Sequence, residues 1–182
     1  AIFIGVFISQ GRPIAAVHLA IAGLSTAAMT HALKYGFAVP RPELVHYIPS
    51  SFAYPSGHSS GAAILYGLVA SFIAQEQSQS QRWKVYLALG CPIVMIALSR
   101  VLLGVHWFSD IIGGMLLGFT LCAITRIFYS RYSNTEQRKV QLNASKNKIK
   151  AIIGFIVWGG ICIGYQASYF SKTLAEFQLI TS

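Results

Sequence analysis

Two histidines and one aspartate in this chain are of the types that perform nucleophilic and acid–base chemistry. His106 and Asp110 are spaced i, i+4, so on one helix their side chains would share a face. The Asp110 carboxylate can then accept a hydrogen bond from one ring nitrogen of His106, which leaves the other nitrogen free to attack. His58 can supply a proton to the leaving oxygen. These residues predict a nucleophile, its orienting carboxylate and a general acid.

Three permanent cations accompany these residues: Lys34, Arg41 and Arg100. Each is expected at the outward end of an apolar span or just beyond it, where a charge is costly and usually functional. Three cations converging on one place are typical of an oxyanion site, and a phosphoryl group is the expected occupant. The cations could hold the charge of a transferring phosphoryl group without a metal ion.

Residues 55–58, Pro-Ser-Gly-His, predict the beginning of a helix beside this anion. Ser56 can act as the N-cap, and Gly57 allows the backbone to approach a ligand closely. The free amides of a helix N-terminus point toward a bound anion. We therefore expect this helix start to form part of the substrate site.

Long apolar runs position these groups. The chain is 54% hydrophobic and 10% charged, and its mean hydropathy is +0.57, whereas soluble domains carry roughly 25% charged residues. A helix needs about 20 mostly apolar residues to cross the hydrocarbon core of a bilayer. The runs without Asp, Glu, Lys or Arg are 13–33, 44–74, 85–99, 111–125 and 151–171. The sequence predicts an all-α, polytopic membrane helix bundle of about five to six spans, with the active site at the outward ends of the core helices.

The same pattern predicts how the chain is organised. Residues 1–12 are expected to be the remnant of a preceding membrane helix, because they are apolar and lack a basic n-region. Residues 13–129 would form the core, residues 130–150 a basic cytoplasmic linker, and residues 151–182 an appended C-terminal membrane span and tail. The spans are expected near 13–35, 57–75, 84–103, 106–129 and 151–170.

The basic residues predict the orientation in the membrane. When the gaps between spans are assigned alternately to two sides, one side receives Arg12, Arg82, Lys84 and the basic residues of 126–150, and the other receives Lys34, Arg41, Arg100 and Lys172. The positive-inside rule puts the first group in the cytoplasm. We therefore expect an integral membrane protein of a bacterial inner membrane, with its active site facing the periplasm. The net charge of +9 lies mostly in these short segments, which argues against a nucleic-acid partner.

Three ordered blocks carry most of these residues: Lys34-x6-Arg41-Pro42, Pro55-Ser56-Gly57-His58 and Ser99-Arg100-x5-His106-x3-Asp110. Together they resemble the signature of the type 2 phosphatidic acid phosphatase superfamily. Blocks with fixed internal spacing are far more specific than a single short motif. The superfamily includes membrane lipid phosphate phosphatases and bacterial undecaprenyl-pyrophosphate phosphatases. The resemblance covers roughly residues 13–129, which it identifies as a phosphatase core.

The resemblance implies a role for each matching residue. His106 would be the nucleophile that forms a phosphohistidine, Asp110 its orienting partner and His58 the general acid. The residues expected to bind the substrate phosphate are Lys34, Arg41, Ser56, Gly57, Ser99 and Arg100. Such enzymes generally work without a metal ion, so no cofactor is expected.

The leading expectation is a membrane-bound phosphatase that hydrolyses a lipid phosphate or pyrophosphate, such as a prenyl pyrophosphate or phosphatidic acid. Two alternatives stay open: a lipid-to-lipid phosphotransferase, and a non-catalytic lipid-binding or transport module of a larger membrane protein. Intact His58, His106 and Asp110 count against the module, because binding alone needs cations but no nucleophile–carboxylate pair. His31, one turn before Lys34, could line the pocket or be structural. The sequence leaves the lipid and the oligomeric state open.

Overall fold

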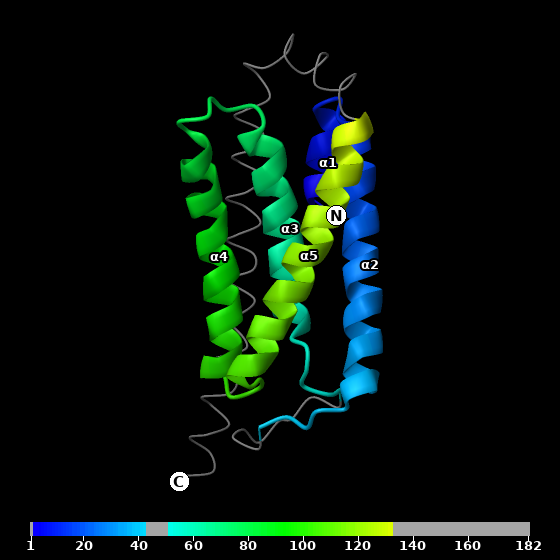
Figure 1. The fold of residues 1–182 in the computed structure, drawn as a ribbon, viewed down its shortest axis with the longest axis vertical. Helices are drawn as coiled ribbons and strands as arrows, with labels where there is room; N and C mark the ends of the chain where they lie inside the picture. Colours follow the sequence, from blue (N-terminus) through cyan, green and yellow to red (C-terminus); the bar gives the residue numbers. More distant parts are fainter. Residues whose placement is uncertain (1, 43–50, 133–182) are drawn as a thin grey trace.

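The structure is a computed structural model that describes residues 2–42 and 51–132. The helices in these ranges are α1 (Ile2–Ser9), α2 (Pro13–Phe37), α3 (Gly57–Ala74), α4 (Arg82–Leu102) and α5 (Phe108–Tyr132) (Figure 1). The last four are long and apolar enough to cross a membrane. The predicted all-α membrane bundle is therefore confirmed. The span expected near 151–170 lies outside the described residues.

The ends of the helices follow from local chemistry. α2 begins at Pro13, which suits a first helical position because the N–H that proline lacks would have no partner there. It ends at Phe37, and the following Ala38 caps it: its φ of 48° is left-handed and its N–H donates to the Lys34 carbonyl. α5 begins at Phe108, two residues later than predicted, and runs to Tyr132, into the first residues of the expected linker.

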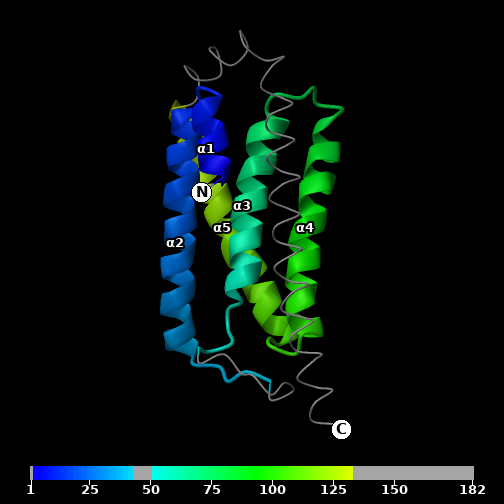
Figure 2. The ribbon, with the colours of Figure 1, turned by 180° about the vertical axis from the view of Figure 1, so that it is seen from behind.

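α3 is the central helix of the bundle. It contacts α2, α4 and α5, and it lies between α2 and α4 in both views (Figures 1 and 2). α5 slants from the end of α4 toward the end where α1 meets α2 (Figure 1). The α2–α3 connection and the α4–α5 turn therefore come to the same end of the bundle (Figure 1).

Two glycines allow α5 to approach α3 closely. A Cβ atom at Gly114 would lie 2.5 Å from the carbonyl oxygen of Ser56, and one at Gly118 would lie 2.6 Å from the Cβ of Ala63. Small residues permit such backbone contact between membrane helices. The contact brings the two helix starts together, and the Ser56 N–H donates to the carbonyl of Asp110 at 3.0 Å.

A buried arginine connects three segments at the end of the bundle opposite the α2–α3 connection. Arg12, which is only 4% exposed, forms an ion pair with Glu76 at 2.5 Å and donates to the Tyr129 hydroxyl at 3.3 Å. Its guanidinium also lies over the rings of Phe7 and Phe72. Because a buried charge is costly unless it is paired, these contacts hold the α1–α2 turn, the α3–α4 turn and the end of α5 together.

The outward faces of α2, α4 and α5 carry large apolar side chains. The exposed ones include Val17, Ile21, Leu24, Leu87, Val94, Met95, Leu98, Ile112, Leu116, Phe119 and Ile124. Contiguous apolar surface on this scale is unusual for a soluble monomer. In a bilayer, lipid tails can cover these faces, because the tails are as apolar as a leucine side chain.

Candidate active site

The predicted site residues gather at one end of the bundle, although they come from distant parts of the chain. Lys34 lies in the last turn of α2, Arg100 in the last turn of α4 and Asp110 in the first turn of α5. His58 is the second residue of α3, and His106 lies in the turn before α5. Four helix ends, together with the segment after α2 that carries Arg41, thus bring together the three cations, both histidines and the carboxylate.

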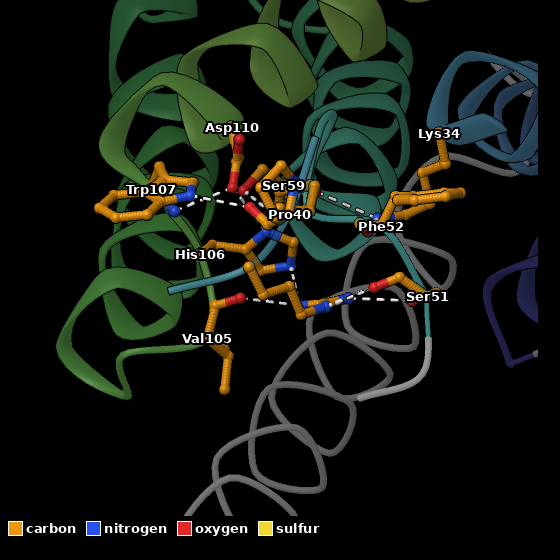
Figure 3. A network of polar contacts seen from close by, with 12 residues as sticks. Lys34, Pro40, Ser51, Phe52, Ser59, Val105, His106, Trp107 and Asp110 are labelled. Atoms are coloured by element: carbon orange, nitrogen blue, oxygen red, sulfur yellow. Dashed lines mark hydrogen bonds and ion pairs between the residues drawn. The ribbon is translucent and has the colours of Figure 1, made fainter. Parts of the chain in front are cut away.

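His106 and Asp110 form the predicted pair, but not on one helix face. The Nδ1 atom of His106 lies 3.1 Å from Oδ2 of Asp110, while α5 begins only at Phe108. The same Oδ2 accepts the backbone N–H of Trp107 at 2.8 Å. An acidic side chain in the first turn commonly accepts from the residue that precedes the helix. The carboxylate therefore reaches back from the helix start and holds the turn that carries His106 (Figure 3).

Arg41 fixes which ring nitrogen of His106 carries the proton. Its Nη1 lies 3.2 Å from Nε2 of His106 and donates to the Val105 carbonyl at 2.7 Å. A guanidinium can only donate hydrogen bonds. Nε2 is therefore the unprotonated acceptor, and Nδ1–H donates to Asp110, which is the tautomer that a nucleophile needs.

The surroundings of His106 keep its ring neutral. The side chain is almost fully buried, and this burial lowers its pKa from 6.5 to about 3, with further lowering by the cations Arg41 and Lys34. Burial and neighbouring positive charge both oppose protonation of an imidazole. Nε2 therefore stays unprotonated at neutral pH.

Backbone carbonyls and serine hydroxyls hold the cations in place. Arg41 donates from Nε to the carbonyl of Ser51 at 2.7 Å and from Nη2 to its hydroxyl at 3.0 Å (Figure 3). Lys34 donates from Nζ to the carbonyls of Phe52 and Ala53. Arg100 is buried, and its Nε donates to the Ser99 hydroxyl at 3.3 Å. These contacts orient the long side chains before an anion binds.

The start of α3 has the predicted cap. The Ser56 side chain accepts the backbone N–H of Ser59 at 3.4 Å and is fully buried. The Ser59 hydroxyl also donates to it, at 3.1 Å. Gly57 and His58 follow and are both exposed. A role of Ser56 and Gly57 in binding phosphate stays a prediction, since capping is the contact described for the Ser56 side chain.

Sequence reasoning missed several supporting residues. Trp107 donates from its indole nitrogen to the Pro40 carbonyl at 3.0 Å and so holds the segment of Arg41 (Figure 3). The Thr30 and Ser60 hydroxyls are 2.9 Å apart and link α2 to α3. Their positions carried a weak signal, because Thr30 lies one turn before Lys34. His31 lines a cavity next to the site. Within residues 2–42 and 51–132, no group of three or more His, Cys, Asp or Glu residues is arranged to hold a metal ion.

The chain is similar in sequence to known proteins. The family model of the PAP2 superfamily matches residues 15–134. Phosphatidylglycerophosphatase B of Bacillus subtilis is 37% identical over 97 residues, which are 52% of this chain and 47% of that protein. An undecaprenyl-diphosphatase of Sulfolobus acidocaldarius is 36% identical over 70 residues, or 38% of this chain and 30% of that protein. The chain thus matches at most about half the length of these curated relatives.

A solved structure also resembles the fold. It is the crystal structure of a transmembrane PAP2 type phosphatidylglycerolphosphate phosphatase from Bacillus subtilis, which is similar with a TM-score of 0.64 and 28% sequence identity. The similarity covers 71% of this chain and 66% of that one. The helix arrangement is therefore shared with a transmembrane phosphatidylglycerolphosphate phosphatase.

Proposed function

This chain belongs to the PAP2 superfamily, as its three motif blocks predicted, and from that premise we propose that it is a membrane-bound phosphatase that hydrolyses a lipid phosphate or pyrophosphate. The observation that carries the proposal is the pairing at His106. Its Nδ1 donates to Asp110 while its Nε2 keeps a lone pair beside Arg41. A site that only bound an anion would need cations but no nucleophile held in this tautomer.

The reaction follows from these positions. The Nε2 lone pair of His106 attacks phosphorus, a P–N bond forms, and the bond from phosphorus to the lipid oxygen breaks. His58 gives a proton to that oxygen, and the Asp110 carboxylate stabilises the positive charge on the His106 ring. Water then attacks the phosphohistidine and gives a proton to His58, which releases phosphate and restores the neutral ring. Lys34, Arg41 and Arg100 stabilise the negative charge on the phosphoryl oxygens throughout.

The proposed substrates are lipids whose phosphate lies at head-group depth. The site is at the end of four membrane helices, so a phosphate there sits at the interface while its hydrocarbon stays in the bilayer. The relatives act on phosphatidylglycerophosphate and undecaprenyl diphosphate according to their names. A prenyl pyrophosphate, phosphatidic acid and phosphatidylglycerol phosphate are therefore the first candidates for this chain.

We place the protein in a bacterial inner membrane with the site facing the periplasm. The support is the distribution of charge: Arg82 and Lys84 begin α4 at the end opposite the site. The positive-inside rule assigns such a basic end to the cytoplasm.

Phosphate release from a panel of purified lipids tests the proposal. Wild type should release phosphate from at least one lipid, whereas His106→Ala should lose turnover while keeping its melting temperature in detergent close to that of wild type. Substrate added to wild type and quenched without acid should leave phosphate on His106. Full activity of His106→Ala would exclude this mechanism. Release that depends on an added acceptor lipid would instead indicate the alternative, a lipid-to-lipid phosphotransferase.

A further inference from the structure

A cavity of about 790 Å³ lies between α1, α2 and α3 and extends away from the active site. At one end its walls include Lys34 and Gly57, which belong to the phosphate site. At the other end they include Leu19 of α2 and Phe3 of α1. The cavity therefore adjoins the candidate phosphate site at Lys34 and Gly57.

The lining of the cavity changes from polar to apolar with distance from the candidate phosphate site. The polar side chains Lys34, His31 and Ser51 lie at the active-site end. Beyond them the lining is apolar, with Leu19, Ala20, Leu24, Ala27, Ile64 and Leu65. Two hydroxyls in the lining, those of Thr26 and Thr30, are hydrogen-bonded to the Ala22 carbonyl and to Ser60. A ligand that matches these walls has one anionic end and a long apolar body.

The cavity is open to the side of the bundle, so it forms a groove. Leu24 on its wall is 72% exposed, and Gly23 beside it is exposed as well. In a bilayer, this side faces lipid tails, since α2 is one of the spanning helices. A hydrocarbon chain could therefore enter from the membrane while its phosphate stays at the interface.

We propose that this groove binds one hydrocarbon chain of the lipid phosphate substrate, and that Gly23 and Gly61 are specificity-determining residues that set how long a chain it accepts. The inference rests on the proposed function, because the phosphate of the same lipid must lie at Lys34. It goes further, because it assigns the hydrocarbon chain of the lipid to this groove and names two residues that set the accepted chain length.

The two glycines are not explained by helix packing. A Cβ atom at Gly23 or at Gly61 would meet no atom within 4 Å, in contrast to Gly114 and Gly118, where it would collide with α3. Glycine is also a poor helix former, so neither residue favours its own helix. The open groove gives a reason for the missing side chain at both positions.

Their positions divide the groove into segments. Gly61 lies four residues beyond Gly57, which is about 6 Å along α3. Gly23 lies eleven residues before Lys34, which is about 16 Å along α2. A side chain at 61 would therefore close the groove near the phosphate, whereas one at 23 would shorten it and leave the nearer part open.

The test uses Gly61→Leu and Gly23→Leu in the full chain, purified in detergent. Gly90→Leu on α4 is the matched control, because a Cβ there also meets no atom within 4 Å and Gly90 does not line the groove. The substrates are butyl, octyl, dodecyl and hexadecyl phosphate, presented at a constant mole fraction of detergent. For each variant and each substrate, kcat/KM is divided by the wild-type value.

The expected loss of kcat/KM increases with the chain length of the substrate. Each methylene withdrawn from an apolar site costs roughly fourfold in binding. Gly61→Leu should therefore lose more than about tenfold on dodecyl and hexadecyl phosphate and keep its activity on butyl phosphate. Gly23→Leu should lose activity on hexadecyl phosphate alone, and Gly90→Leu should match wild type on all four.

Other outcomes overturn the inference. If both groove variants keep the wild-type ratio at every chain length, the chain does not bind there. If they lose activity equally on all four phosphates, the groove packs against protein, such as another membrane helix or a second copy of the chain. If wild type hydrolyses none of these phosphates or any lipid of the panel, it is the proposed function that fails, and the inference falls with it.

Discussion

The Nη1 atom of Arg41 lies 3.2 Å from Nε2 of His106, the nitrogen that would attack phosphorus. While Nε2 accepts this hydrogen bond, its lone pair cannot attack. A substrate phosphate offers the guanidinium better acceptors, because anionic oxygens form stronger hydrogen bonds with arginine than a neutral imidazole does. Substrate binding would thus draw Arg41 away from Nε2 and free the nucleophile in the same step.

Asp110→Asn should lower kcat roughly 10³-fold or more, as the loss of an orienting carboxylate does in hydrolase triads. The reason is that, in the proposed mechanism, the carboxylate would stabilise the positive charge that His106 acquires when it binds phosphorus. Its Oδ2 lies 3.1 Å from Nδ1 of His106. The measurement is kcat on the best lipid substrate, with the melting temperature as the check on folding. A loss smaller than tenfold would show that Asp110 does not stabilise the charged ring.

The pH dependence of stability should report the neutral state of His106. Its pKa is lowered from 6.5 to about 3 in the folded protein, mainly by burial. Below 6.5 the unfolded chain therefore binds a proton that the folded chain does not, so this residue lowers the free energy of unfolding by about 2 kcal/mol at pH 5. The effect is absent above 6.5 and stops growing below about 3. The melting temperature of wild type should fall more between pH 7 and pH 5 than that of His106→Ala. An equal fall in melting temperature for the two proteins would contradict this prediction.

Activity should not require a divalent metal ion. Lys34, Arg41 and Arg100 gather at the site and would supply the positive charge that Mg²⁺ supplies in many phosphoryl-transfer enzymes. Phosphate release should survive EDTA, and vanadate should inhibit it because it mimics five-coordinate phosphorus. The reverse result, loss with EDTA and recovery with Mg²⁺, would require a metal in the mechanism.

Gly118→Ala should destabilise the bundle by about 1–3 kcal/mol, because overpacking a tight contact has this cost. The new Cβ would lie 2.6 Å from both the Cβ of Ala63 and the Ser60 carbonyl oxygen. Gly90→Ala is the control, since nothing lies within 4 Å of its Cβ. Melting temperatures in the same detergent compare the two variants. Equal stability would mean that α5 can move away from α3 without cost.

Labelling in intact cells should reveal the sidedness. The variants carry one cysteine each, Leu102→Cys or Ser80→Cys, with the native Cys91, Cys122 and Cys162 replaced by alanine. Leu102 ends α4 at the active-site end and is 85% exposed, whereas Ser80 is exposed in the turn at the opposite end. A membrane-impermeant thiol reagent should label Leu102→Cys in intact spheroplasts and Ser80→Cys only after lysis. The reverse pattern would put the site in the cytoplasm.

Much of the fold was predictable because hydropathy and helix ends are local properties. The ranges expected for α2, α3 and α4 differ from the observed ones by at most two residues. The geometry at His106 was less certain, since the i, i+4 spacing fits both a shared helix face and a carboxylate that reaches back from a helix start. The sequence interpretation chose the first, and the structure has the second.

Contacts between distant segments could not be predicted. Arg12 was counted as one more cytoplasmic charge, yet it is buried against Glu76, 64 residues away. The groove had no signal either, because Gly23 and Gly61 look like ordinary helical glycines in sequence. It exists only where α1, α2 and α3 leave space between them.

The partners of Arg12 also determine when the bundle can be completed during synthesis. Tyr129 is 117 residues farther along the chain, so at about 5–20 residues per second the ribosome needs on the order of ten seconds to supply it. Glu76 is made earlier, 64 residues after Arg12, so the Arg12 guanidinium can form its ion pair before Tyr129 is supplied. α1 and α2 can therefore pack against α3 before α5 is made, but the contacts of Arg12 are complete only after α5 has followed.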